Sequence, residues 1–328
     1  RKIIENEFSS LNDMQKKAVL STEGPLLVLA GAGSGKTTVL VNRIANIMKY
    51  GRAYYSDEAA YEPSENELSL MRAAANGEVS ADELFDIEPL LSVSPAKPWE
   101  ILAITFTNKA AGELKERLER MLGEQARDIW ASPFHSACVR MLRRNAENIG
   151  YSSNFTIYDT DDSKRVIKDC IKQLGFSDKI LTPKTCLGEI SRAKDSLLSP
   201  EEYTQQNYVD IMKLNVGAVY ASYQARLKAA DAMDFDDIIV NAVRLLQSND
   251  EVLGYYQRKF RYIMVDEYQD TNHAQYLLTS LLAGGYKNLC VVGDDDQSIY
   301  KFRGATIENI LSFEHQYQNA KVIRLEQN

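Results

Sequence analysis

The chain has 328 residues, of which 45% are hydrophobic and 26% charged, and its formal net charge is −8. This composition indicates a protein that buries a core over two or three compact units. The negative charge argues against the broad basic surface that is usual in nucleic-acid binders, so any contact with nucleic acid must come from a local groove.

The four cysteines are scattered without a Cys-x-x-Cys pair, and no two of the three histidines have the spacing of metal ligands. This pattern is typical of reduced thiols in the cytoplasm and argues against a zinc site. No signal peptide is recognisable, and no apolar stretch approaches the roughly 20 residues that span a bilayer, so we expect a cytoplasmic protein with no membrane partner. Because the chain begins at Arg1 and stops at Asn328 after a strand-like run, we expect a piece of a longer protein.

Short apolar runs rich in Val, Ile and Leu predict strands that are buried on both faces. They occupy residues 25–30, 101–106, 262–265, 288–292 and 321–325. Helix-like segments alternate with them at residues 37–49, 109–122, 272–282 and 307–315. Strands that alternate with helices predict an α/β fold with a parallel sheet.

Two stretches interrupt this alternation. Residues 51–97 are acidic, contain turn formers and predict a surface insertion with short helices at 67–75 and 80–85. Residues 153–231 show helical apolar spacing after a strand-like run at 155–158, and they predict an inserted all-helical subdomain. The α/β domain is then formed by residues 1–152 and 232–328.

A phosphate-binding loop is the clearest motif. The first predicted strand leads into Ala30-Gly31-Ala32-Gly33-Ser34-Gly35-Lys36-Thr37, with Thr38 next, where a helix begins. Small residues let backbone N–H groups point at phosphate oxygens, and the helix N-terminus adds a partial positive charge. Lys36 is expected to hold the β- and γ-phosphates and Thr37 to bind Mg²⁺. Ala30 stands at the first glycine of the consensus, and an ordinary glycine-rich turn is the alternative.

An acidic pair follows another predicted strand. Asp266 and Glu267 come directly after residues 262–265, at the strand end where open α/β sheets place their ligands. Asp266 is expected to hold Mg²⁺, directly or through water, and Glu267 to orient and deprotonate the attacking water. A solvated acidic turn is the alternative.

A third segment, residues 293–305, also follows a strand. Gln297 is expected to sense the γ-phosphate or its water. Tyr300 and Phe302 alternate with basic residues, Arg303 among them, and this interleaving is the chemistry of single-strand binding by base stacking. Two aromatic residues after a strand can also belong to the core.

Together these segments resemble the UvrD/Rep/PcrA-type superfamily 1 DNA helicases. Residues 11–15 resemble the family's N-terminal glutamine motif, in which Gln15 would read adenine, although Asn12 and Gln15 also have the spacing of a helix capping box. Residues 30–37, 266–269 and 293–305 resemble motifs I, II and III. Family members often carry tryptophan at the position of Phe302, and Arg303 would serve either DNA or the coupling network.

Two further segments resemble the family's DNA-contacting motifs. Residues 105–111 resemble motif Ia, which implies that Phe106 touches a base and that Thr107 and Asn108 touch backbone phosphate. Residues 134–136 resemble the next motif and make His135 a DNA contact, but Pro133 stands where many members have threonine. Residues 234–237 resemble the segment where the chain returns from the helical insertion, and we expect helix caps there in preference to a metal site.

The resemblance implies a RecA-like domain that binds ATP and Mg²⁺ in an ATP-dependent 3′–5′ helicase of DNA repair or replication. Its partners would be single-stranded DNA, the duplex junction, repair proteins and the C-terminal motor domain of the same protein, without which this chain is expected to be inactive. The alternatives are a non-unwinding DNA-binding regulatory ATPase and the motor part of a helicase–nuclease. Residues 51–97 depart from the family, and we expect a neutral surface excursion in preference to a DNA- or partner-binding element.

Overall fold

The computed structural model describes residues 1–328 except 32, 60, 178, 295–312, 314 and 326–328. Its centre is a sheet of six strands, all paired in parallel, in the order β3-β2-β6-β7-β1-β8. The strands are β1 Leu26–Ala30, β2 Ile101–Thr105, β3 Trp130–Pro133, β6 Tyr262–Val265, β7 Leu289–Gly293 and β8 Lys321–Leu325. Every residue of β1, β2, β6 and β7 is buried, which explains their unbroken apolar sequences.

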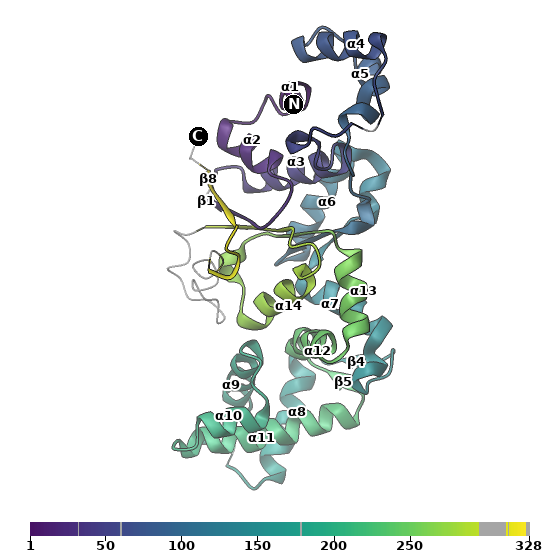
Figure 1. Cartoon of the computed structure of the whole chain (residues 1–328). Coiled ribbons are helices and arrows are strands. Elements are labelled where there is room, and N and C mark those ends of the chain that lie inside the picture. Colours follow the sequence, from purple (N-terminus) through teal and green to yellow (C-terminus); the bar gives the residue numbers. More distant parts are fainter. Residues whose placement is uncertain (32, 60, 178, 295–312, 314, 326–328) are drawn as a thin grey trace.

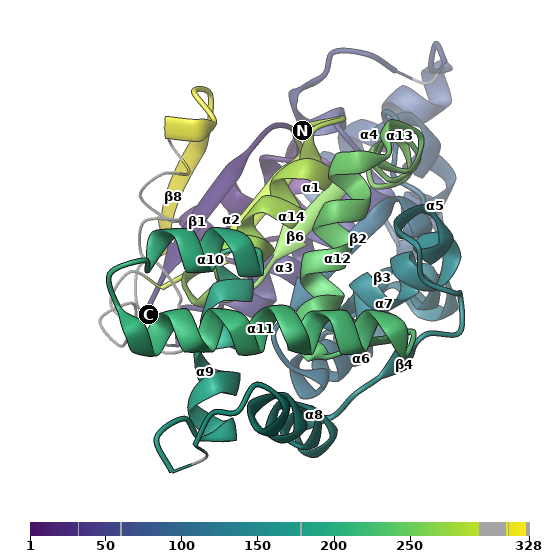
Figure 2. The ribbon, with the colours of Figure 1, turned by 90° about the horizontal axis from the view of Figure 1, so that it is seen from below.

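Helices cover both faces of this sheet (Figures 1 and 2). One face packs against α1 Lys2–Glu7, α2 Asp13–Leu20, α3 Lys36–Lys49 and α6 Asn108–Leu122. The other face packs against α7 Phe134–Asn145, α12 Phe235–Ser248, α13 Asp250–Lys259 and α14 His273–Ala283. Side chains alternate along each strand, so Val28 joins the first hydrophobic core and its neighbours Leu27 and Leu29 join the second.

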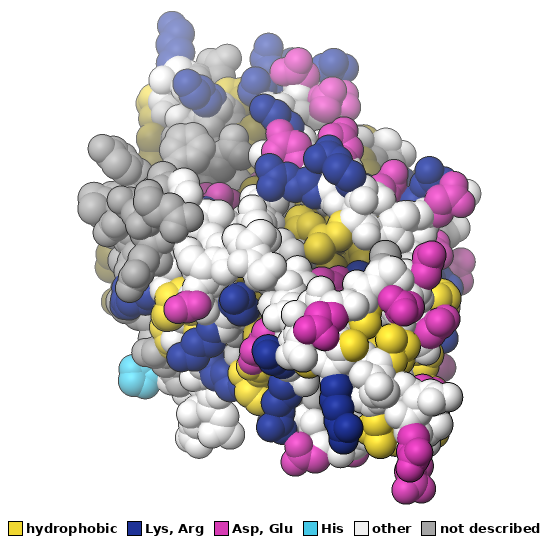
Figure 3. Space-filling view, turned by 90° about the horizontal axis from the view of Figure 1, so that it is seen from above, with side chains coloured by type: hydrophobic (Ala, Val, Ile, Leu, Met, Phe, Trp, Pro, Cys, Tyr) yellow, Lys and Arg dark blue, Asp and Glu magenta, His cyan; other side chains and the backbone are white. Residues whose placement is uncertain are grey.

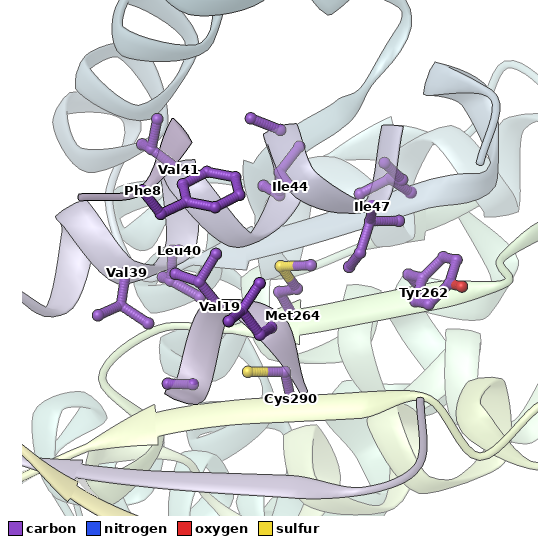
Figure 4. Packing of buried hydrophobic residues seen from close by; sticks show 14 of the residues in the cluster. Phe8, Val19, Val39, Leu40, Val41, Ile44, Ile47, Tyr262, Met264 and Cys290 are labelled. Carbon is purple, nitrogen blue, oxygen red and sulfur yellow. The ribbon is translucent and has the colours of Figure 1, made fainter. Parts of the chain in front are cut away.

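The core beneath α3 shows how this helix is held. Figure 4 shows Leu40, Ile44 and Ile47 of α3 above Met264 of β6 and Cys290 of β7. Full burial of one such aliphatic side chain stabilises the fold by about 1.5–3 kcal/mol. The start of α3, which carries the phosphate-binding loop, is therefore fixed to the centre of the sheet.

The segment between α3 and β2 lies beside α1, at the end of the molecule shown from above in Figure 3, where Asp and Glu side chains are interspersed with Lys and Arg. It contains η1 Ala53–Tyr55, α4 Glu65–Asn76, α5 Ala81–Ile87, η2 Glu88–Leu91 and η3 Pro98–Glu100. Its base is closed by a bridge between Gly51 and Val93. Gly51 has φ +60°, and a Cβ there would lie 2.2 Å from the Val93 carbonyl oxygen, so only glycine fits without rearrangement.

A helical subdomain is inserted between α7 and α12. It consists of α8 Thr160–Gln173, α9 Pro183–Asp195, α10 Pro200–Gln206 and α11 Ile211–Ala229, which enclose a hydrophobic cluster of their own. Its entry and exit are joined by two short parallel strands, β4 Thr156–Ile157 and β5 Ala232–Met233. η4 Gly123–Asp128 and η5 Ala146–Ile149 are short connecting turns in the α/β part.

The predicted fold class is confirmed: a RecA-like parallel sheet flanked by helices carries an inserted helical subdomain. The five predicted strands form within one residue at either end, whereas β3 was not predicted because its sequence, Trp-Ala-Ser-Pro, is not an apolar run of Val, Ile and Leu. The helix expected at 307–315 falls almost wholly outside the described residues. Within the described part of the chain, no helix has the length and apolar character needed to cross a membrane.

Candidate nucleotide site and nucleic-acid surface

Two loops that carry predicted site residues emerge at the carboxyl edge of the sheet, on either side of strand β7. Strand β7 lies between β6 and β1, and all three run in the same direction. The phosphate-binding loop follows β1, the acidic pair follows β6, and Asp294 follows β7. The fold therefore brings these segments to one place, where open parallel sheets bind their ligands.

The phosphate-binding loop has the backbone that an anion cradle requires. Gly33 and Gly35 have φ of +80° and +85°, in the left-handed region that favours glycine. The Ser34 hydroxyl donates to the Gly31 carbonyl over 2.7 Å, which closes the turn. Lys36 is the first residue of α3, so the loop ends on a helix N-terminus. Ala32 lies outside the described residues.

Lys36 and the acidic pair face each other. The Lys36 ammonium (Nζ) lies 3.1 Å from a carboxylate oxygen (Oε2) of Glu267, and its side chain is only 13% exposed. Thr37 and Thr38 occupy the first turn of α3 behind it. Two residues that are 231 positions apart in the chain thus form an ion pair at the carboxyl edge of the sheet.

Asp266 is a partly buried carboxyl group beside a second acid. Burial, and then the neighbouring charge of Glu267, raise its pKa to about 6, against the opposing effects of the Glu267 backbone N–H and the Lys36 charge. A divalent cation bound here would offset both the burial of the Asp266 charge and its repulsion by Glu267. The oxygen donors of Asp266 and Thr37 suit Mg²⁺, which takes few protein ligands and keeps water and phosphate for the rest. The described residues form no cluster of three or more His, Cys, Asp or Glu side chains that could hold a metal ion.

Glu267 is held in an unusual backbone conformation. Its φ is +49°, a left-handed value that costs a non-glycine residue on the order of 1–3 kcal/mol and that recurs at functional sites. The Gln269 amide donates to Glu267 Oε2 over 2.7 Å and accepts the Asp294 backbone N–H over 3.0 Å. Gln269 is 3% exposed and links the segments after β6 and β7, a role that sequence reasoning did not assign. The available signals were its position two residues after the acid and its place in the segment that resembles motif II.

Gln15 touches the phosphate-binding loop. Its side chain closes the predicted capping box with Asn12, and its Nε2 donates to the Ser34 carbonyl over 3.0 Å. Helix α2 is held there by α3, where the buried Arg43 donates to the Ala18 carbonyl over 2.8 Å and Asn46 to the Val19 carbonyl over 3.0 Å. Gln15 thus borders the loop that begins at Ala30.

The third predicted segment cannot be placed in this way. Gln297, Tyr300, Phe302 and Arg303 all lie outside the described residues.

The remaining predicted DNA contacts lie at the carboxyl ends of β2, which pairs with β6, and of β3, the edge strand beyond it. Phe106 is half-buried and packs edge-on against Phe134, with 5.4 Å between ring centroids. The exposed Thr107 accepts the Ala110 N–H over 3.1 Å and so caps α6, and the exposed Asn108 is the first residue of that helix. The motif is thus a strand end followed by a helix cap, and it leaves Thr107 and Asn108 exposed.

His135 lies on the same rim. Its ring is 4.4 Å from that of Phe235, and burial lowers its pKa to about 4, so it is neutral at neutral pH. Phe235 is 57% exposed despite its size, and sequence reasoning missed it because it stands between two acidic residues. Pro133 occupies the N-cap of α7 and offers no side-chain cap there, unlike the threonine of many family members.

A separate cavity of about 650 Å³ lies at the opposite, amino edge of the sheet. It is lined by Thr22, Glu23, Tyr55, Lys321 and neighbouring residues of the insertion. Charged groups on its rim pair with one another, Arg52 with Glu58 over 2.8 Å. Because it lies at the opposite edge of the sheet, it is separate from the phosphate-binding loop and from the acidic pair.

The fold and the loop before Lys36 define a P-loop nucleotide-binding domain. Comparison with known families is more specific: the chain belongs to the UvrD-helicase family, whose model of the UvrD/REP helicase N-terminal domain matches residues 11–57 and 86–318. The unmatched residues 58–85 lie inside the insertion that the sequence set apart.

Curated relatives are bacterial proteins named ATP-dependent DNA helicase PcrA. The Bacillus subtilis (strain 168) protein is 48% identical over 323 residues, which are 98% of this chain and 38% of the relative. The Staphylococcus epidermidis (strain RP62A) protein is 47% identical over 319 residues, 97% and 38% of the two chains, and the Staphylococcus aureus (strain Mu50) protein 46% identical over 321 residues, 98% and 38%. The chain therefore spans 38% of the length of these relatives.

Proposed function

We propose that this chain is the ATP-binding motor domain of an ATP-dependent DNA helicase that moves 3′ to 5′ along single-stranded DNA, in DNA repair or replication. The observation that carries the proposal is the meeting of Lys36 and Glu267 across 3.1 Å at the carboxyl edge of the sheet. The names of the relatives favour a helicase over a non-unwinding regulatory ATPase.

The nucleotide would lie on the loop from Ala30 to Thr38, with its base near Gln15. Lys36 would exchange Glu267 for the β- and γ-phosphates, so that the carboxylate is released towards an incoming water molecule. Glu267 would accept a proton from that water, while Gln269 keeps the carboxylate oriented. Asp266 and Thr37 would hold Mg²⁺, which neutralises charge on the phosphates.

Single-stranded DNA would cross the ends of β2 and β3. Phe106 and Phe235 offer aromatic faces, and each stacked base contributes about 1–3 kcal/mol. Thr107 and Asn108 would contact phosphate, and His135 would act as a neutral polar group beside Phe235. Tyr300, Phe302 and Arg303 would extend this surface, and Gln297 would sense the γ-phosphate.

We propose three parts for the chain: residues 1–152 with the insertion 51–97, a helical subdomain 153–231, and residues 232–328. The separate hydrophobic cluster of the helical subdomain supports this division. A C-terminal motor domain of the same protein would supply arginines to the γ-phosphate. Such arginines are worth roughly 10³–10⁵ in rate in related enzymes, so this chain alone would hydrolyse ATP poorly and unwind nothing. The duplex junction and repair proteins would be further partners, in the cytoplasm.

The test is Lys36→Ala in the full-length protein. Turnover of ATP should fall to background, because the ammonium that holds the phosphates is lost, whereas single-stranded DNA should bind with nearly unchanged affinity. Lys164→Ala, which removes an exposed lysine of α8 from a weak ion pair with Asp161, is the matched control for loss of one positive charge. Equal turnover by Lys36→Ala and the unaltered protein would contradict the assigned role.

A further inference from the structure

The last two residues of α9 lie between the helical subdomain and the α/β core. Lys194 is 1% exposed, and its ammonium lies 2.6 Å from Asp234 and 2.9 Å from Asp237 at the start of α12. From α11, Tyr223 donates to Asp234 over 2.8 Å and Gln224 donates to Asp237 over 3.0 Å. The acidic segment is a capping box, as predicted, and it is also the anchor of the subdomain.

The next residue, Asp195, reaches a different helix. Its Oδ1 accepts the side-chain amide of Asn272 over 2.6 Å, 77 positions along the chain. Asn272 is the N-cap of α14, where its own oxygen accepts the Gln275 N–H over 2.9 Å. Adjacent residues of one helix therefore contact the first turns of two core helices.

Each of these first turns leads to one of the two proposed sites. Asp234 is followed directly by Phe235, which packs against His135 on the nucleic-acid surface. Asn272 comes five residues after Glu267, and the chain between them is one tight turn. The Asp270 N–H donates to the Glu267 carbonyl over 2.9 Å, and the Thr271 hydroxyl to the Tyr268 carbonyl over 2.6 Å.

The turn between Glu267 and Asn272 is tightly packed, so a movement of one end displaces the other. Tyr268, Gln269 and Thr271 are all less than 5% exposed, and only Asp270 of this turn faces solvent, so a shift of Asn272 must move packed side chains. Glu267 already occupies a left-handed backbone conformation that its surroundings must maintain. A small displacement at the start of α14 would therefore change the direction of the Glu267 carboxylate.

We infer that Asp195 is a positioning residue, which couples the placement of single-stranded DNA beside Phe235 to the orientation of Glu267 through its hydrogen bond to Asn272. The inference rests on the proposed function and assigns this coupling to the end of α9. Lys194 fixes the helix to the start of α12, and Asp195 passes that position to the start of α14.

The test compares Asp195→Ala with Asp195→Asn in the full-length protein. Alanine removes the acceptor, whereas asparagine keeps an oxygen that the Asn272 amide can reach. With Asp195→Ala, kcat at saturating single-stranded DNA should fall roughly three- to tenfold, the range expected for one lost hydrogen bond, while the KM for ATP and the Kd for DNA change less than about twofold. Asp195→Asn should restore most of the rate.

Two further variants separate coupling from general stability. Asn272→Ser keeps a good helix cap but loses the amide donor, so it should reproduce the Asp195→Ala defect, and the double variant should be no worse than either single one. Asp169→Ala removes an exposed acid of α8 whose ion pair with Arg226 stays inside the subdomain, and it should leave kcat unchanged.

The inference is overturned if Asp195→Ala matches the unaltered protein, or if Asp195→Asn is as impaired as alanine. Failure of the proposed function gives a different result: the unaltered protein would then show no turnover stimulated by single-stranded DNA, and both proposals would fall together.

Discussion

Replacing Lys194 by methionine should destabilise the helical subdomain strongly. Methionine has a similar shape but leaves Asp234 and Asp237 facing each other without a cation, in a site where both are almost fully buried. Removing one partner of a buried ion pair costs about 3–5 kcal/mol. Lys164→Met breaks an exposed pair with Asp161 and should cost under about 1 kcal/mol, so it is the matched control.

Amide hydrogen exchange in α9 and α11 of the full-length protein measures this effect locally. A loss of about 3–5 kcal/mol raises the opening constant by roughly 150- to 5,000-fold, whereas the control should change it by less than about sixfold. Adding Asp234→Asn and Asp237→Asn to Lys194→Met removes the stranded charges, keeps capping side chains and should recover most of the protection. Similar exchange in Lys194→Met and Lys164→Met would refute the reasoning.

The effect should also depend on pH. Burial raises the pKa of Asp237 to about 6 from an ordinary value of 3.8, although Lys194 opposes this shift. Burial acts in the same direction on Asp234, but the adjacent Lys194 ammonium outweighs it and holds that pKa below its ordinary range. Without Lys194 both carboxyl groups bind protons more readily in the folded state. The penalty of Lys194→Met should therefore be largest at high pH and shrink as the pH falls, with the decline beginning above pH 6, because loss of the ammonium raises the pKa of both carboxyl groups further.

The site itself gives two further predictions. Because the pKa of Asp266 is raised to about 6, its carboxyl group takes up a proton below that pH, and Mg²⁺-dependent nucleotide binding measured by calorimetry should weaken between pH 7.5 and 5.5; affinity that is flat across this range would exclude Asp266 as a metal ligand. Phe235→Ala should weaken single-stranded DNA binding, measured by fluorescence anisotropy, by roughly 5- to 150-fold, the equivalent of one stacked base. Phe85→Ala, which removes a 73% exposed aromatic of the insertion, should not weaken it, and equal effects of the two changes would argue against a specific surface at Phe235.

The parts of the structure that sequence predicted best are those that depend on local pattern. Parallel strands buried on both faces have unbroken apolar sequences, and the run ending at Lys36 needs its glycines where the backbone turns left-handed at Gly33 and Gly35. Strand β3 lacked such a pattern because its four residues end in Ser-Pro and include no Val, Ile or Leu. The expected gathering of Lys36 and Glu267 followed from the parallel sheet, because its strand ends share one edge.

Contacts between segments that are distant in the chain could not be predicted from the sequence. The acids at 234 and 237 carried a capping signal, but nothing marked Lys194, 40 positions earlier, as their counter-charge. Asp195 and Asn272 are each unremarkable in their own segments, and only the packing of α9 against α14 brings them together. The sequence placed Gln269 close to Glu267 but did not indicate its hydrogen bond to the Asp294 backbone N–H after β7.

The closed base of the insertion allows the segment beyond it to change in length. The Gly51–Val93 bridge brings the two ends of the segment together, so its contour can grow or shrink without pulling on α3 or β2. Lengthening a flexible loop costs little, about 0.6 kcal/mol per doubling, once its ends are fixed. This segment is therefore a suitable place to insert a reporter or a tether, because it lies at the amino edge of the sheet, opposite the proposed nucleotide site.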